Sequence, residues 1–146
     1  MKITSIGHAG LKVVTENGCY LMDPWLSPKG TFQASWFQYP DNSHVLEDKA
    51  IFRPDAVIIS HEHLDHCDPC FLAKVDPAVP IIVPKYPSPA LKTKILMGGK
   101  KQIIEVEQWE TYRFDNGDEL FFVSEPPMNH DSAMIISSQG TTLLNM

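Results

Sequence analysis

The sequence has few cysteines, few basic residues and no long apolar run. Three cysteines, an odd number, argue against a framework of disulfide bonds in these 146 residues. Twelve Lys and Arg against eighteen Asp and Glu give a formal net charge of −6, which disfavours nonspecific nucleic-acid binding. No apolar run approaches the roughly 18 to 20 residues of a membrane span, and residues 1–5 lack the apolar core of a signal peptide. We therefore expect a cytoplasmic protein that binds neither nucleic acid nor membrane.

The chain does have enough apolar residues, 43% of its positions, to build one domain over residues 1–146. Apolar runs separated by turn signals, of which Asn17-Gly18 is the strongest, predict mainly β-structure. The expected strands are 3–6, 11–15, 19–22, 56–60, 81–83, 102–106, 111–114, 119–124, 133–137 and 141–144. Helices are expected over 69–75 and 89–97, and one long ordered loop over 23–53.

A histidine-rich motif directly follows the apolar run 56–60. It has the pattern His-x-His-x-Asp-His and consists of His61, His63, Asp65 and His66. Imidazoles and carboxylates are the usual nitrogen and oxygen ligands of zinc, iron and manganese in proteins. In an extended stretch His61 and His63 point to the same side, so one metal can take both, whereas Asp65 and His66 can turn toward a second. The spacing leaves one metal or two open, and the alternative is a solvated polar loop.

Three further motifs accompany the histidine-rich one in a fixed order along the chain. They are Gly7-His8-Ala9, Asp23-Pro24-Trp25 and His130-Asp131-Ser132-Ala133. With these motifs the chain resembles the metallo-β-lactamase-fold superfamily, in particular metal-dependent hydrolases of the L-ascorbate-6-phosphate lactonase and CMP-sialic-acid-hydroxylase-like branch. The resemblance implies an α/β (α+β) protein, a partial αββα sandwich with the first half and the start of the second. The domain is expected to be incomplete at its C-terminus, because the family's bridging aspartate and a further histidine have no counterpart after His130.

The resemblance also implies which side chains form the site. The implied metal ligands are His61, His63, Asp65, His66 and His130. Asp65 would in addition act in catalysis by orienting the hydroxide. His8 and Asp23 would lie just outside the ligands; alternatively, His8 hydrogen-bonds a turn and Asp23 caps one. The alternative for His130 is an ordinary loop or core histidine.

The implied function is hydrolysis of a small-molecule ester, lactone, amide or phosphodiester by metal-bound hydroxide. One or two divalent ions are expected, with zinc first and manganese or iron as alternatives. The parent protein is expected to be an enzyme, whereas the 146 residues alone could equally be inactive. Two other functions stay open. One is an iron-dependent oxidoreductase of the same fold, and the other is an inactive half-fold that forms a homo-oligomer.

Two other groups of residues have competing interpretations. Cys67 and Cys70 suit a redox pair, half of a zinc site, or packing at the start of a helix. Packing is favoured, because no second Cys-x-x-Cys follows. Trp25 and the aromatic residues at 36, 37 and 39 either line a substrate pocket or pack onto their own domain. His44 has no partner in any motif, and we expect it at the surface.

Overall fold

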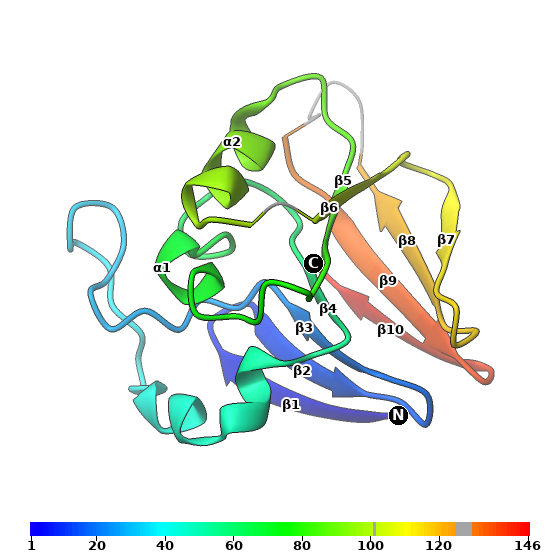
Figure 1. Cartoon of the computed structure of the whole chain (residues 1–146), viewed down its shortest axis with the longest axis horizontal. Helices are drawn as coiled ribbons and strands as arrows, with labels where there is room; N and C mark the ends of the chain where they lie inside the picture. Colours follow the sequence, from blue (N-terminus) through cyan, green and yellow to red (C-terminus); the bar gives the residue numbers. More distant parts are fainter. Residues whose placement is uncertain (101, 125–129) are drawn as a thin grey trace.

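The computed structural model describes residues 1–100, 102–124 and 130–146, which form two β-sheets and a layer of helices (Figure 1). The first sheet is mixed and has the order β1 (Lys2–Gly7), β2 (Gly10–Val14), β3 (Cys19–Met22), β4 (Ala56–Ile58), β5 (Ile81–Pro84), β6 (Ile103–Val106). The second is antiparallel, with the order β10 (Thr141–Asn145), β9 (Ala133–Ser138), β8 (Glu119–Val123), β7 (Thr111–Arg113). The predicted strands are therefore confirmed, with small shifts at their ends.

Among the residues that the structure describes, four short helices connect these strands. They are the 3-10 helices η1 (Ser43–Glu47) and η2 (Lys49–Phe52) and the α-helices α1 (Pro69–Leu72) and α2 (Ala90–Met97). The expectation of a single loop over 23–53 was wrong for its last part, where η1 and η2 form. The Asp48 side chain accepts a hydrogen bond from the Ala50 amide and so begins η2. Within the described ranges, no helix is both long enough and apolar enough to cross a membrane.

Side chains that alternate along the first sheet build two hydrophobic cores. Tyr20 and Met22 face the second sheet, whereas Leu21 between them faces the helices. The core between the sheets also contains Val13, Ala56, Ile58, Ile82, Leu120, Phe122, Met134 and Ile136. The core under the helices also contains Val57, Ile59, Ile81, Val83, Phe71, Leu72, Leu91 and Ile95. The layers are thus helix, sheet and sheet, which agrees with the α/β class and with three layers of the expected sandwich.

A buried aspartate joins the two sheets near the start of β3. Asp118, which precedes β8, is fully buried, and its Oδ2 accepts hydrogen bonds from the hydroxyls of Thr15 (2.6 Å) and Tyr20 (2.9 Å). Burial alone would raise the pKa of Asp118, but hydrogen bonds from Ser138, Thr15 and Tyr20 outweigh it and lower the pKa. The charged carboxylate is therefore the form that the fold stabilises.

We expect Asp118→Asn to lower the free energy of unfolding at pH 7 by about 2 kcal/mol, because hydrogen bonds to charged groups contribute about 1.5–3 kcal/mol. A lowered folded-state pKa stabilises the fold above the unfolded pKa of about 3.9, and this contribution is lost as pH falls through the folded value. The difference in free energy of unfolding between Asp118→Asn and the unsubstituted protein should therefore shrink below about pH 4. Urea unfolding at several pH values measures this difference, with the exposed Asp115→Asn as control. A difference independent of pH would contradict the role of the charge.

Candidate metal centre

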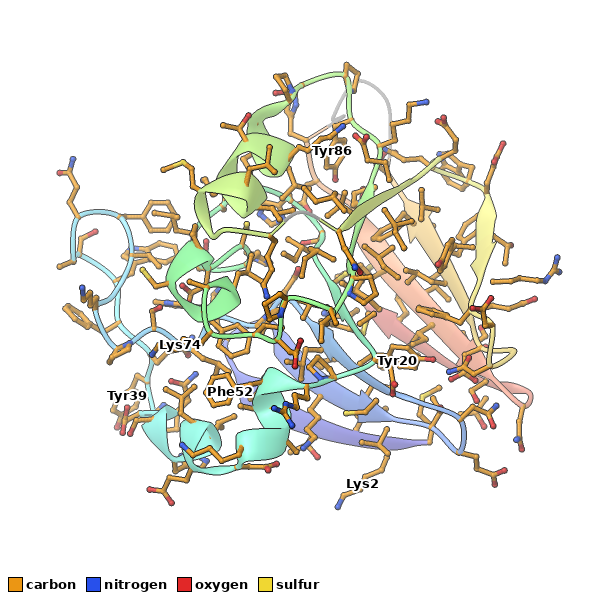
Figure 2. All side chains as sticks on the ribbon, viewed as in Figure 1. Lys2, Tyr20, Tyr39, Phe52, Lys74 and Tyr86 are labelled. Carbon is orange, nitrogen blue, oxygen red and sulfur yellow. The ribbon has the colours of Figure 1, made fainter. Side chains whose placement is uncertain are left out.

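The histidine-rich motif begins just after β4, at the carboxyl edge of the parallel strands. Since β3 and β4 are parallel neighbours, Asp23, which follows β3, arrives at the same edge as Ser60. The Asp23 amide donates to the Ile58 carbonyl (2.9 Å), and the Ser60 amide donates to Asp23 Oδ1 (2.8 Å). Ligands of open sheets with parallel strands bind at this edge. The Tyr86 hydroxyl donates to the Ser60 carbonyl, whereas the Tyr20 hydroxyl donates to Asp118. Figure 2 shows these two tyrosines well apart.

Asp23 and Ser60 determine which ring nitrogens of the motif carry a proton. The Ser60 hydroxyl donates to Asp23 Oδ2 (2.7 Å), so it accepts from Nδ1 of His61, which lies 2.8 Å away. Asp23 Oδ2 also accepts from Nδ1 of His66 (2.8 Å). In the neutral form of each ring the proton is therefore on Nδ1, which leaves the lone pair of Nε2 free for a metal.

The rings of His61 and His63 approach each other closely. Nε2 of His61 lies 3.1 Å from Nδ1 of His63. Two nitrogens bound to one tetrahedral zinc at about 2.0–2.1 Å are about 3.3 Å apart, so the observed separation suits a shared ion. Burial lowers the pKa of His61, and the charge of His66 adds to this effect. The neutral ring, which is the form that binds metal, is therefore favoured.

A second group of potential ligands lies beside this pair. His8, Asp65 and His66 each offer one ligand atom, and these atoms lie within 4.8 Å of one another. His8 Nε2 contacts Asp65 Oδ2 at 2.8 Å, whereas Asp65 Oδ1 is buried without a hydrogen-bond partner among the described residues. A buried oxygen left unpaired destabilises a fold unless an ion or water satisfies it. The residues present therefore fit a divalent metal.

His66 has the opposite pKa shift to His61. Burial alone would lower the pKa of His66, but its hydrogen bond to Asp23 and the charges of Asp23 and Asp65 outweigh burial and raise it. Protonated His66 is thus stabilised when no metal is bound. A metal at this ring has to displace that proton, so its binding should weaken as the pH falls.

The predicted ligand His130 lies at the surface, directly after residues 125–129, which are outside the described ranges. The next residue, Asp131, contacts the motif instead, with Oδ1 3.1 Å from His61 Nδ1. The Tyr86 hydroxyl lies 2.7 Å from both the Ser60 carbonyl and Ser132 Oγ, and so ties β5, the end of β4 and the start of β9 together. The sequence patterns indicate no role for Tyr86 or Asp131, since both residues reach the motif only through the tertiary fold.

The two cysteines of the Cys-x-x-Cys pair lie in different surroundings. Cys67 is buried in the core under the helices, and burial raises the pKa of its thiol to about 12. Cys70, on α1, is exposed. A redox pair or zinc site requires both sulfurs at one place and at least one accessible thiolate. The arrangement favours packing, the interpretation preferred from the sequence.

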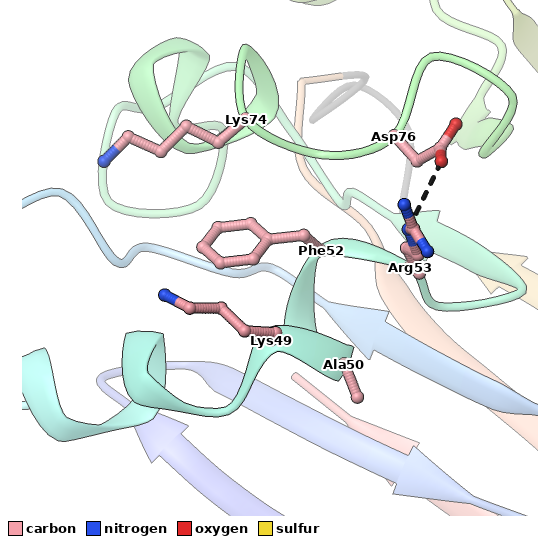
Figure 3. Close-up of a pocket in the computed structure, with 6 residues that line it drawn as sticks. All are labelled: Lys49, Ala50, Phe52, Arg53, Lys74 and Asp76. Atoms are coloured by element: carbon pink, nitrogen blue, oxygen red, sulfur yellow. Dashed lines mark ion pairs between the residues drawn. The ribbon is translucent and has the colours of Figure 1, made fainter.

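A cavity of about 550 Å³ lies at the opposite, amino edge of β4 and β5. Its walls come from η2 and the turn after α1 and consist of Lys49, Ala50, Phe52, Arg53, Lys74 and Asp76 (Figure 3). The side chains of Lys49 and Lys74 extend beside the Phe52 ring, while Arg53 pairs with Asp76 at 3.5 Å. Three cations around one carboxylate repel a divalent metal. This cavity is therefore not the metal centre.

Known proteins resemble this chain in sequence and in fold. The family model described as "Beta-lactamase superfamily domain" matches residues 19–143. The chain belongs to this superfamily. This beta-lactamase superfamily protein is 34% identical over 155 residues to a Mycobacterium tuberculosis protein that is named as a Rieske 2Fe-2S iron-sulfur protein. The alignment covers 100% of the chain and 29% of that relative. It is 29% identical over 82 residues to a UPF0173 metal-dependent hydrolase of Cereibacter sphaeroides, covering 56% of the chain and 31% of that protein.

A solved structure has the same fold. The isothiocyanate hydrolase from Delia radicum gut bacteria superposes on this superfamily member with a TM-score of 0.71 at 18% identity, over 99% of the chain and 61% of the hydrolase. The superfamily resemblance seen in the four motifs is thus confirmed. The chain spans 29% of the length of the Mycobacterium relative and 31% of the Cereibacter one.

Proposed function

We propose that this protein is a metal-dependent hydrolase. The observation that carries the proposal is the meeting of two histidine groups at one sheet edge, with the buried Asp65 carboxylate between His8 and His66. Similarity to a UPF0173 metal-dependent hydrolase and to isothiocyanate hydrolase supports it. The chain covers less than two thirds of the length of each of these two proteins. That the 146 residues are active by themselves is therefore a proposal as well.

One or two divalent ions would be held by the chain's own nitrogens and oxygens. His61 Nε2 and His63 Nδ1 would hold one, joined by His130 as the resemblance implies. Asp65 and His66 would hold the other. These donors suit zinc first, and manganese or iron also. A bound ion would lower the pKa of coordinated water from about 15.7 toward 7 and so supply hydroxide at neutral pH.

The protein side chains would position the reacting groups. Asp23 keeps the His66 ring oriented through Nδ1, and Ser60 does the same for His61. His8 holds the Asp65 carboxylate through Oδ2, which also lies 3.7 Å from His66 Nε2, so this carboxylate would orient the attacking water beside the second ligand group. Suitable substrates would be small molecules with an ester, lactone, amide, phosphodiester or isothiocyanate group, the last by analogy with the named structural relative.

Elemental analysis of the chain, purified without added metal, tests this proposal first. We expect at least one equivalent of zinc, manganese or iron per chain. Hydrolysis of a panel of nitrophenyl esters, lactones and bis(nitrophenyl) phosphate should disappear with a chelator and return when the same metal is added. A chain that purifies without metal and also fails to bind added zinc would overturn the proposal.

A second candidate function is iron-dependent oxidation and reduction. The identity of 34% to a protein named for a Rieske cluster favours it, and histidines with a carboxylate also suit non-haem iron. A Rieske cluster itself uses two cysteines and two histidines, and the different surroundings of Cys67 and Cys70 disfavour one here. Iron as the purified metal, together with consumption of dioxygen, would select this function over hydrolysis.

A further inference from the structure

The segment 30–39, called the aromatic loop below, exposes four large rings. The exposed fractions are 39% for Phe32, 52% for Trp36, 61% for Phe37 and 97% for Tyr39. Figure 2 shows Tyr39 at the outer edge of the molecule. Clustered apolar exposure on this scale usually marks a surface that binds something.

The loop has a defined conformation that brings its ends together. Thr31 and Trp36 form a small antiparallel bridge, with the Thr31 amide donating to the Trp36 carbonyl at 2.9 Å. At the tip, three consecutive residues without glycine, Phe32, Gln33 and Ala34, have φ of 49°, 60° and 61°. Left-handed backbone is unfavourable for such residues and persists only where the surroundings impose it. Ser35 Oγ donates to the Phe32 carbonyl (2.6 Å) and helps to hold this tip.

Two rings of the loop lie directly against the metal centre. The Phe32 ring centroid is 6.4 Å from that of His63, and the Trp36 centroid is 6.4 Å from that of His8. Phe32 and Trp36 also contact each other edge to face, with centroids 5.1 Å apart. Together they form one apolar surface that extends from the His61 and His63 pair to the second ligand group. This surface therefore adjoins both groups of potential ligands.

We propose that Phe32 and Trp36 bind the non-reacting part of the substrate and select substrates with an aryl or similarly bulky apolar group beside the scissile bond. This inference rests on the proposed hydrolase function, because it assigns the substrate class of the same site. The occupant is a substrate group because both rings contact histidines of the centre. A second copy of the chain or another protein on this surface would instead cover the metal.

Two thiols that bind metal alike but differ in their apolar part test the inference. Benzyl mercaptan and 2-mercaptoethanol are titrated into the Co²⁺-loaded chain, and binding is followed by the thiolate-to-cobalt absorption. We expect benzyl mercaptan to bind at least about tenfold more tightly, since its ring can lie on Phe32 and Trp36. Trp36→Ala and Phe32→Ala should each reduce this preference to below about threefold.

Matched variants make the result specific. Tyr39→Ala, in the same loop and 97% exposed, should keep the full preference, and Phe32→Leu should keep most of it. Cobalt content and urea unfolding identify any variant that fails to fold. Equal affinity for both thiols in the cobalt-loaded protein would overturn this inference but not the hydrolase proposal, whereas a chain that binds no metal overturns both. A dimer that dissociates on Trp36→Ala would assign the loop to a second copy and also overturn the inference.

Discussion

His61→Ala is expected to lower the affinity of the chain for zinc by at least about 100-fold, the upper end of what loss of a ligand-orienting partner causes. His61 is buried, its ring is oriented by Ser60, and its Nε2 faces His63 at 3.1 Å. Removing it leaves His63, an exposed side chain, to hold the ion without its neighbour. Competition against a chromophoric zinc chelator measures the change, and His63→Ala should produce an effect of similar size.

His44→Ala is the matched control for this experiment. His44 lies on η1 and is exposed, so its removal deletes one imidazole from the chain without touching the centre. Zinc affinity should stay within about twofold of the unsubstituted chain, because surface substitutions usually have small effects. Equal losses of affinity in all three variants would show that zinc binds to scattered surface imidazoles rather than at the motif.

Most of the fold could be predicted because strands leave local signals. The turn at Asn17-Gly18 separates two apolar runs, and the hairpin of β2 and β3 forms there, with Thr15 donating to the Gly18 carbonyl at 2.8 Å. The continuous apolar run 56–60 suited a strand buried on both faces, and Val57 and Ile58 indeed lie in different cores. The order of strands within the sheets depends on contacts between distant residues and was not predicted from these patterns.

The structure of the segment 23–53 could not be predicted from local sequence patterns. Its 3-10 helices are only four and five residues long, too short for a hydrophobic period, and the Asp48 cap is their main sequence signal. The aromatic loop has no period at all, and its bridge between Thr31 and Trp36 depends on left-handed residues that the sequence does not mark with glycine. Propensity alone therefore could not place these rings beside the histidines.

The candidate ligands could be proposed from the sequence, but the residues that hold them in place could not. His61, His63, Asp65 and His66 are adjacent in sequence, and one turn of chain suffices to gather them. The Tyr86 hydroxyl contacts the Ser60 carbonyl, although the two residues are 26 positions apart. Asp131 lies just before β9 and contacts His61 because the second sheet packs on the first. Such contacts follow from the whole fold, so no spacing rule indicates them.

Asp23→Asn is expected to lower zinc affinity by about 10-fold to 100-fold, even though Asp23 is not assigned as a ligand. Its carboxylate is buried and accepts hydrogen bonds from the Ser60 amide, the Ser60 hydroxyl and His66 Nδ1. An amide in its place has one acceptor oxygen and a donor group that opposes these donors. The Nδ1 proton of His66 would lose its charged partner, and the free energy of unfolding should also fall by about 2 kcal/mol.

Two comparisons separate this role from general destabilisation. Asp41→Asn removes an exposed aspartate that accepts hydrogen bonds from the amide and hydroxyl of Ser43, two residues away, and it should leave zinc affinity unchanged. Asp118→Asn should destabilise the fold to a similar extent while zinc affinity of the folded protein stays the same, because Asp118 lies at the other end of the sheet. If Asp23→Asn loses stability but keeps its zinc affinity, then Asp23 only caps the turn after β3, the alternative that the sequence left open. If it loses both, the carboxylate that orders the backbone at this sheet edge also orients the imidazoles for the metal.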